Sequence, residues 1–401
     1  SQGALQMSDN VFDMALNSEG WFGVQNSNKQ VNYTRSGSFG IDASGYLTDA
    51  SGNYLLGTLG GNVTPTTLDQ STLDAYGTTT GGTSLSLADA YAVSNIEDIP
   101  LGTVTSQSKI KLPNLLYFPA SPTTNVSYQA NLDPTIKRDA LNQEIPNVEH
   151  FSSTVISPSG DNETLDMTFT KRVPQQTTGT IWDAKVQILG TAQTYDASQT
   201  YDPTQYSVDT TKNKVYPIVD SKTGVLTFDS SGKLSSSTIS VLSNSGVPLT
   251  LDLGTPGTYD GLFSSADFNT ARSEQHNGYE DGLLKGYGMD NNGNVVAQFS
   301  NGKDVPIAKV AVYHFQNDQG LEKVGNSLFR ASQNSGNPIF YTDSSGKPIL
   351  GTEISPNRLE SSNVSLSTAL TELIVMQKAF DASSKSITTS DELIKNAINM
   401  K

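Results

Sequence analysis

The sequence contains no cysteine among its 401 residues. A disulfide framework and a thiolate metal site are therefore both excluded, and stability must come from packing. Histidine occurs three times and tryptophan twice. No run approaches the roughly 20 apolar residues that a membrane-spanning helix requires. The first residues, SQGALQMSDN, show no basic region followed by an apolar one, so they carry no Sec-type signal.

Basic residues are also few. Lysine and arginine together number 25 against 40 aspartates and glutamates, which gives a net charge of −15. Because nucleic acid and anionic lipid repel so acidic a chain, we expect no nucleic acid partner and no membrane insertion. The length exceeds what one hydrophobic core usually organises, so the sequence predicts two or three domains.

Runs rich in helix formers are missing from all but the last forty residues, which predicts a mainly β fold. Short alternating runs between Phe12 and Leu56 are separated by Gly, Asn and Asp and indicate a β-meander. A second region of alternating pattern begins near Val126. From Gly278 the meander pattern returns, with strands joined at DNNG and SNGKD.

The C-terminal segment has almost no glycine or proline and a helical period. Bulky residues at intervals of seven and smaller ones three positions later predict an a/d seam on a helix of about 36 residues, about 54 Å long. Such a helix requires other helices to cover it, although an amphipathic helix folded back on its own β domain is the alternative. The expected seam comprises Leu366, Ala369, Leu370, Leu373, Met376, Phe380, Ile387, Ile394 and Ile398, with Ser383, Ser390 and Ala397 at further d positions.

No catalytic motif is present. His150, His276 and His314 have no partner at metal-ligand spacing, and neither a nucleophile elbow nor a phosphate-binding loop occurs. Neighbouring acids, such as Glu280 with Asp281 or Asp161 with Glu163, resemble a glycosidase pair, but in so acidic a chain they fit a solvated surface better. We therefore expect no enzyme, no cofactor and no metal site.

The pattern Asp-x-x-Gly recurs along the chain, with copies that start at Asp42, Asp49, Asp229, Asp290 and Asp343. A calcium β-roll needs tandem glycine-rich nonapeptides, and an EF-hand needs several acidic ligands with a glutamate at position twelve. The copies in this chain are scattered rather than in tandem, and each contributes one aspartate. They also lie between strand-like runs. They therefore predict hairpin turns, with Gly45 at positive φ and no ion beside Asp42 or Asp49.

Three blocks of the sequence, in order, resemble the bacterial flagellar hook and rod protein family. The first is FDMALNSEGWFGVQ followed by YTRSGSFGIDASGYL, in which Trp21 replaces a more usual Phe. The second begins with NGYEDGLLKGYG, and the third is ESSNVSLSTALTELIVMQKAF. The residues that carry this signature are Trp21, Phe22, Tyr33, Thr34, Arg35, Gly37, Phe39, Asp42, Gly45, Leu47, Gly278 and Tyr279.

The resemblance implies a discontinuous β domain with a second β domain inserted into it, plus a long C-terminal α-helix. The expected boundaries are 1–132 for the N-terminal half of the first domain, 133–277 for the inserted outer domain, 278–357 for the C-terminal half, and 358–401 for the axial helix of an inner tube. Residues 190–260 match no block. Family members also carry an N-terminal axial helix that pairs with the C-terminal one, and this sequence does not include it.

The function implied by the resemblance is that of a structural subunit. It would self-assemble into the curved tubular hook, which transmits torque from rod to filament. Expected partners are further copies of the chain together with rod, hook cap and hook-filament junction proteins. The location would be extracellular, after export through the flagellar secretion apparatus. A distal rod subunit is the alternative within the family, and a secreted β-rich adhesin is the alternative from another class.

Overall fold

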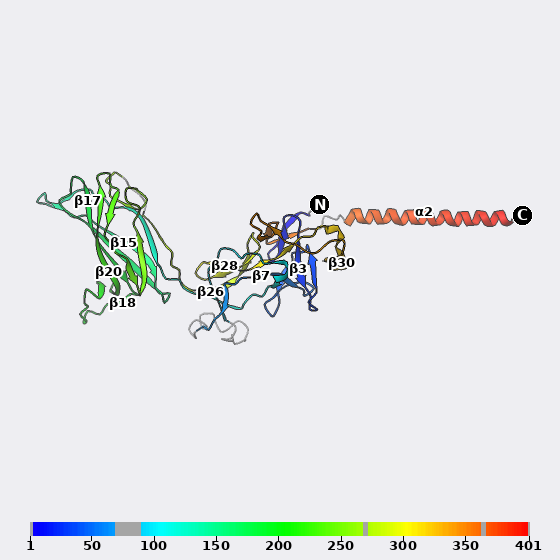
Figure 1. Ribbon diagram of the computed structural model, residues 1–401, viewed down its shortest axis with the longest axis horizontal. Coiled ribbons are helices and arrows are strands. Elements are labelled where there is room, and N and C mark those ends of the chain that lie inside the picture. The colour runs from blue at the N-terminus through cyan, green and yellow to red at the C-terminus, as the bar shows by residue number, and fades with distance from the viewer. Residues whose placement is uncertain (1–2, 69–89, 268–271, 362–365, 400–401) are drawn as a thin grey trace.

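The computed structural model describes residues 3–68, 90–267, 272–361 and 366–399. Figure 1 shows two β domains in line and a single long helix beyond them. We call the domain next to the helix the inner domain and the other the outer domain. The prediction of a mainly β fold with a C-terminal helix is confirmed. None of the helices in the described part of the chain combines the length and apolarity needed to cross a bilayer.

The inner domain is built on one 15-stranded sheet. Its central path runs β30-β31-β4-β3-β7-β28-β27-β26-β11-β9-β8. The strands before the outer domain are β3 (Trp21–Gln25), β4 (Val31–Thr34), β5 (Phe39–Ile41), β6 (Leu47–Asp49), β7 (Tyr54–Leu59), β8 (Val63–Pro65), β9 (Ala90–Val93), β10 (Ser108–Lys109) and β11 (Leu115–Phe118). Those after it are β26 (Gly282–Met289), β27 (Asn294–Phe299), β28 (Asp304–Val310), β29 (Val312–Tyr313), β30 (Glu322–Gly325) and β31 (Leu328–Arg330).

Short elements complete this domain. Three two-stranded ribbons pair β1 (Leu5–Met7) with β35 (Arg358–Glu360), β2 (Met14–Leu16) with β34 (Ile354–Pro356), and β32 (Tyr341–Thr342) with β33 (Pro348–Ile349). Single 3-10 turns lie at η2 (Val104–Ser106) and η3 (Asp318–Gly320). Residues 58–68, which are part of a region rich in Gly and Thr, contain the end of β7 and all of β8, whereas residues 69–87 lie outside the described part of the chain.

Strands from both halves of the sequence alternate in this sheet, so the inner domain is discontinuous. β7 pairs with β28, placing Leu59 opposite Ala308. The chain leaves the sheet on β11 and returns on the adjacent, antiparallel β26, with Phe118 opposite Gly282. The outer domain is inserted between these two neighbouring strands.

The outer domain is a sandwich of two sheets. The first contains β15 (Val148–Ile156), β16 (Asn162–Lys171), β17 (Gly179–Leu189), β18 (Gln193–Thr194), β19 (Tyr206–Asp209), β20 (Lys214–Asp229) and β21 (Leu234–Ser237). The second contains β12 (Asn125–Asn131), β22 (Leu242–Asn244), β23 (Val247–Asp252), β24 (Leu262–Phe263) and β25 (Ser273–His276). A separate hairpin pairs β13 (Lys137–Arg138) with β14 (Glu144–Ile145).

Alternation of side chains explains the sandwich. In β16 the buried positions are every second residue, and Leu165, Met167 and Phe169 face the core. Trp182 on β17 is fully buried there, and its Nε1 donates to Ser264 Oγ at 3.2 Å. Each domain thus has a core of its own, and no residue belongs to both.

The division of the chain at β12 follows from these cores. Val126 and Tyr128 of β12 pack in the outer core, although residues up to 132 were expected in the first domain. We therefore propose that the inserted domain begins just before β12 and ends with β25. This segment also includes residues 190–260, where β18 to β23 extend the two sheets.

The Asp-x-x-Gly segments that start at Asp42, Asp49, Asp229, Asp290 and Asp343 form hairpin turns of one design. Asp42 Oδ1 accepts from the backbone N–H of Ser44 and of Tyr46, each at 2.8 Å. Gly45 has a φ of 84°, which confirms the predicted left-handed conformation. Asp49, Asp229, Asp290 and Asp343 make the same pair of bonds to their own turns. The aspartates therefore serve to close turns.

The turns at Gly45 and Gly52 share a conformation but differ in their surroundings. The same substitution in both therefore separates the cost of an unfavourable φ from the cost of a steric clash. We expect Gly52→Ala to cost about 1 kcal/mol, because an L-residue is disfavoured at φ 78°. At Gly45 an added Cβ would also lie 2.8 Å from the Leu112 carbonyl oxygen, whereas nothing lies within 4 Å at Gly52. We expect Gly45→Ala to cost about 1–3 kcal/mol more. Equal losses in chemical denaturation of the two variants would contradict this.

Candidate assembly surface

The C-terminal helix is α2 (Leu366–Asn399), 34 residues long. Every described side chain from Ser367 to Asn396 is exposed, so neither β domain covers the helix. Figure 1 shows it extending beyond the inner domain. The alternative of a helix folded back on its own β domain is therefore not the arrangement in this chain.

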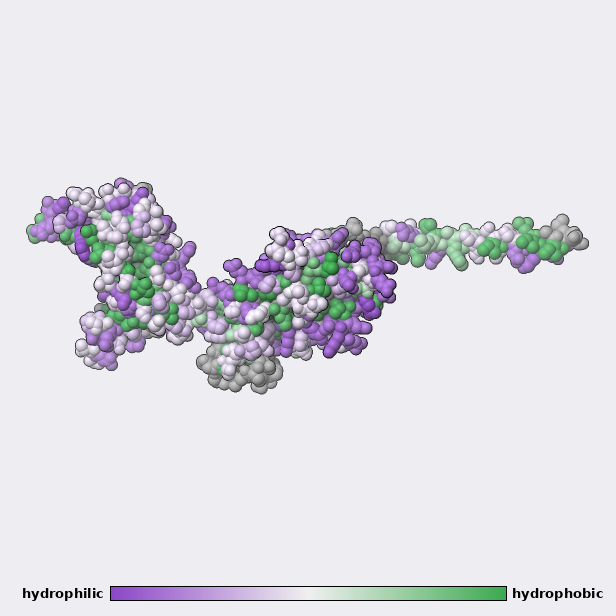
Figure 2. All heavy atoms as spheres, viewed as in Figure 1, coloured by the Kyte–Doolittle hydropathy of each residue, from purple (hydrophilic) through white to green (hydrophobic). Residues whose placement is uncertain are grey.

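Apolar side chains line this exposed helix, as Figure 2 shows along its length. Among the expected seam residues, Phe380 is 74% exposed, Met376 71% and Ile387 70%. The other exposed members of the seam are Ala369, Leu370, Leu373, Ile394 and Ile398. The side chains of Leu366 and Ala397 lie outside the described part of the structure. So much exposed apolar surface on one element marks an interaction site.

The exposed apolar surface is wider than the expected seam. Ile374, Val375 and Leu393 lie outside the a and d positions and are more than half exposed. The signal was present in the run LIVM at 373–376, which has too many consecutive apolar residues for a single stripe. A helix that is apolar on several sides is suited to burial among more than one neighbour.

Several hydroxyl groups on α2 form hydrogen bonds within the helix. Ser383 Oγ donates to the Ala379 carbonyl at 2.9 Å, and Thr389 Oγ1 donates to that of Lys385 at 2.8 Å. Thr371 bonds to Ser367 in the same way. A hydroxyl that is already bonded to the preceding turn loses little on burial, because burying a polar group is costly mainly when it lacks a partner. Ser383, one of the two serines at d positions, is thus compatible with a packed seam.

The aromatic signature residues pack in or against the hydrophobic core of the inner domain. Phe22 is fully buried and packs edge to face on Phe39, with ring centroids 5.6 Å apart. Tyr33 is 5% exposed, and burial raises its pKa to about 12. Tyr279 stacks on Phe118 at 5.0 Å, beside the entry to the outer domain. These residues therefore maintain the scaffold.

The remaining signature residues fix backbone geometry. Arg35 donates from Nη2 to the Ser18 carbonyl at 2.8 Å and lies 5.8 Å from the Trp21 ring. A Cβ on Gly37 would lie 1.7 Å from the Met14 carbonyl oxygen, so the backbones of two segments touch there. Gly278 is equally restricted, with Thr123 Oγ1 2.1 Å from an added Cβ. The signature residues thus maintain the fold, and the exposed apolar side chains of α2 form the candidate assembly surface.

The histidines have structural partners. His150 Nδ1 lies 3.1 Å from Thr168 Oγ1, and His276 Nδ1 lies 3.1 Å from the Gly278 carbonyl. The third, His314, is buried and lies 2.7 Å from the Leu350 carbonyl through Nε2. Within the described residues no group of three or more His, Asp or Glu side chains is placed to hold a metal ion.

The acid pairs do not face one another across a cleft. Glu163 points into the outer core, where burial and then the nearby Asp161 raise the pKa of its carboxyl. Asp161 is exposed and accepts from Ser159 Oγ at 2.6 Å. Glu280 accepts a hydrogen bond from Asn162 Nδ2. Asp161 therefore stabilises the turn before β16, and Glu280 links β16 of the outer domain to the segment that returns to the inner domain.

Two family models match the chain. Residues 15–81 match the "Flagellar hook protein FlgE/F/G D1 domain", and residues 355–400 match the "Flagellar basal body rod FlgEFG protein C-terminal". The first covers most of the signature strands and the second covers α2. The resemblance predicted from the sequence is confirmed.

Curated relatives are flagellar hook proteins FlgE. That of Helicobacter pylori strain 26695 is 38% identical over 153 residues, which is 38% of this chain and 21% of that protein. The Treponema pallidum protein is 27% identical over 100% of this chain and 82% of its own length. That of Salmonella typhimurium is 24% identical over 97% of this chain, also covering 82% of the relative. The chain thus aligns with only about a fifth of the H. pylori protein but with most of the other two.

A solved structure shares the fold. The crystal structure of the H. pylori flagellar hook protein FlgE2 matches with a TM-score of 0.54 and 16% identity, over 89% of this chain and 100% of that one. The families and relatives matched are structural rather than enzymatic, in agreement with the expectation from the sequence.

Proposed function

We propose, from the premise that this chain is a relative of the bacterial flagellar hook proteins, that it is a structural subunit of the flagellar hook. In this proposal copies of the chain polymerise into a curved tube that transmits torque from rod to filament. The single observation that carries the proposal is α2, a 34-residue helix whose apolar side chains are exposed in the monomer. A polymer removes that surface from water, which is favourable at roughly 25 cal/mol per Å².

The two β domains take the outer layers of the proposed tube. Their surfaces are polar and acidic, so contacts between them are weaker than the packing of α2. Weak contacts are able to open on the convex side of a bend and close on the concave side while the helical core stays intact. Rod, hook cap and junction proteins at the ends of the tube, and an extracellular location reached by export, belong to this same proposal.

Hook is favoured over rod by the inserted outer domain. The two family models cover both classes, but the match to a solved hook protein spans that protein entirely and includes most of this chain. The adhesin alternative has less support, because both tryptophans are buried in domain interiors rather than displayed on a sheet face.

Electron microscopy of the native, full-length protein tests the proposal. We expect purified protein to form curved tubes above a critical concentration. Short straight tubes would instead favour the rod. A protein that stays monomeric at all concentrations and in cells would contradict both assignments.

A further inference from the structure

The two β domains are joined by two segments of chain that run side by side. Residues 119–124 lead out of the inner domain, and residues 277–281 lead back to it. Ser121 and Tyr279 lie opposite each other in an antiparallel bridge, in which each backbone N–H donates to the other residue's carbonyl, at 2.9 and 3.1 Å. Figure 1 shows this connection as the narrow part of the molecule between the outer domain and β26. We call the two segments together the linker ribbon.

The outer end of the linker ribbon is fixed to the outer domain. Thr123 is fully buried, its backbone N–H donates to the Ile156 carbonyl at 2.9 Å, and its Oγ1 accepts from the Ile156 N–H at 2.8 Å. Asn244, also fully buried, donates through Nδ2 to the carbonyls of both residues, at 3.1 and 2.8 Å. Beside them, Asn277 Oδ1 accepts from the backbone N–H groups of the two residues after Thr123, each at 3.0 Å. Because buried hydrogen bonds are costly to leave unmade, this end moves with the outer domain.

The inner end of the linker ribbon is fixed to the inner domain. The Tyr279 ring stacks on Phe118, with centroids 5.0 Å apart, and packs against the inner core. Asn301, in the turn between β27 and β28, donates through Nδ2 to the Glu280 carbonyl at 2.8 Å. Tyr279 and Glu280 therefore move with the inner domain. A change in the angle between the two domains must arise in the middle of the ribbon.

A turn of the outer domain reaches across this middle part. Residues 157–161 form the turn between β15 and β16. A Cβ added to Gly160 would lie 3.1 Å from Ala120 Cβ, so the turn lies against the outgoing segment. Directly after the turn, Asn162 Nδ2 donates to Glu280 Oε1 on the returning segment. This hydrogen bond joins a residue of the outer domain to one that the inner domain holds.

Without such a contact the two domains would be free to move. Their cores share no residue, and domains with a small polar interface are expected to move relative to each other. A two-stranded ribbon on its own is only marginally stable. A hydrogen bond beside the ribbon removes this freedom while it is made. Because Asn162 and Glu280 are both exposed, the bond has a modest net energy and is able to open.

We propose that the hydrogen bond between Asn162 and Glu280 is a latch that holds the outer domain at one angle to the inner domain, and that its release frees the linker ribbon to bend. The freed motion has a preferred direction, because the turn 157–161 already lies against Ala120. Bending toward the turn forces its backbone onto the Ala120 side chain, whereas bending away from it requires only that the latch opens. The inference concerns a single subunit and does not depend on polymerisation.

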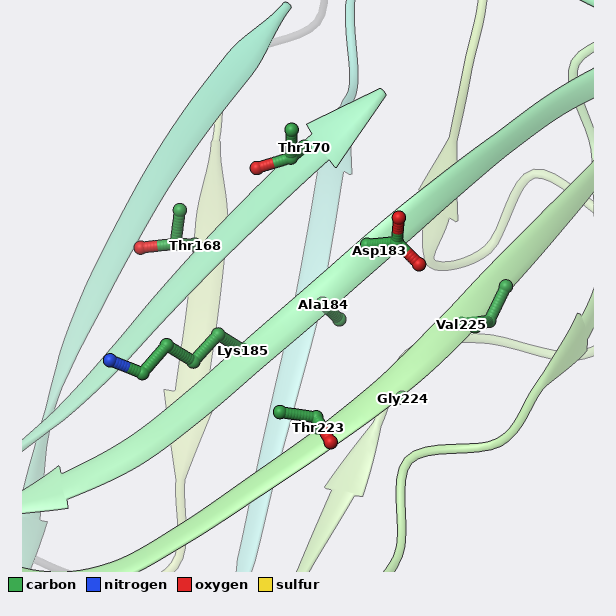
Figure 3. Close-up of a pocket in the computed structure, with 8 residues that line it drawn as sticks. All are labelled: Thr168, Thr170, Asp183, Ala184, Lys185, Thr223, Gly224 and Val225. Atoms are coloured by element: carbon green, nitrogen blue, oxygen red, sulfur yellow. The ribbon is translucent and has the colours of Figure 1, made fainter. Parts of the chain in front are cut away.

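Distances between two spin labels measure the angle between the domains. Because the sequence contains no cysteine, two introduced cysteines carry the only labels. One replaces Lys185, which extends from β17 at the hollow of the first sheet shown in Figure 3. The other replaces Gln298, which is exposed on β27. Both strands lie inside their sheets, between two paired neighbours, so the labels report the motion of whole domains. In the free chain, below the concentration at which it assembles, we expect one narrow distribution of distances.

Removing either partner of the latch should broaden that distribution. We expect Asn162→Ala and Glu280→Ala each to raise the fraction of molecules outside the main distance peak by about two- to tenfold, the effect of one hydrogen bond of ordinary net strength. Glu280→Gln keeps an acceptor oxygen and should stay close to the unaltered protein. Thr164→Ala, at the next outward position of β16, is the matched control and should change nothing.

Two results would overturn the latch. An equally narrow distribution in the unaltered protein and in both alanine variants would mean that the junction is rigid without it. An equally broad distribution in all of them would mean that this contact does not hold the angle. Because the measurement uses the free subunit, its outcome stands even if the protein forms no tubes and the proposed function fails.

Discussion

Replacing Leu373 and Phe380 with aspartate abolishes polymer formation and leaves both β domains folded: this is the largest effect we expect. The two side chains are 53% and 74% exposed in the monomer, so a carboxylate there meets water and costs the monomer little. In a packed seam the same carboxylates are buried without a partner, at an effective penalty of several kcal/mol for each ion. Every subunit of the polymer carries this penalty, so no tube is stable.

The matched control places the same two charges on the other side of the helix. Thr371→Asp with Thr389→Asp adds two carboxylates outside the seam, at positions whose hydroxyls bond only to their own helix. We expect this variant to retain assembly to a much greater extent. Sedimentation and electron microscopy report assembly, and circular dichroism reports the β domains. Normal tubes from the Leu373 and Phe380 variant would show that the seam is not the assembly surface.

Phe22→Ala should destabilise the inner domain by about 3–5 kcal/mol, the usual effect of removing a buried phenylalanine. Its side chain is fully buried and lies edge to face on Phe39. The outer domain should keep its own stability, because the two cores share no residue. The change would then appear in one of two unfolding transitions.

The two tryptophans make this separation measurable. Trp21 lies in the inner domain and Trp182 in the outer core, so in a Trp21→Phe background fluorescence reports the outer domain alone. We expect that fluorescence midpoint to be unchanged by Phe22→Ala, while far-ultraviolet circular dichroism shows the inner transition shifted. Phe169→Ala, in the outer core, is the control and should move the fluorescence midpoint. Transitions that shift together in both variants would refute two independent domains.

Features that depend on neighbouring residues could be predicted from the sequence. The Asp42 turn is one, because the backbone N–H groups that donate to this carboxylate belong to Ser44 and Tyr46, within four positions of it. The strands of the outer sheet are another, because alternation along β16 records which side chains face a core. Helix α2 is a third, although its apolar surface proved wider than the stripe of seam positions, by Ile374, Val375 and Leu393.

Features that depend on distant residues could not be predicted. β12 pairs in parallel with β23, more than a hundred residues later, and no local pattern specifies that partner. The burial of Glu163 is similar, since its neighbours in the sequence are polar and only the sheet turns it inward. Lys171 is the clearest example, because a lysine in an alternating strand gives no sign that it will be buried beneath a hairpin.

The sequence by itself thus determined the β character, the turns, the C-terminal helix and the family resemblance, since each is encoded by residues close together in the chain. Only the tertiary structure decided how the strands of the inner domain interleave, where the inserted domain begins, and which charged groups are buried. It also left α2 uncovered and placed the buried Lys171 against Glu144 of the β13–β14 hairpin. The physical reason is that hydrogen bonds within a turn or helix join near neighbours, whereas sheet order and burial depend on which distant segments exclude water together.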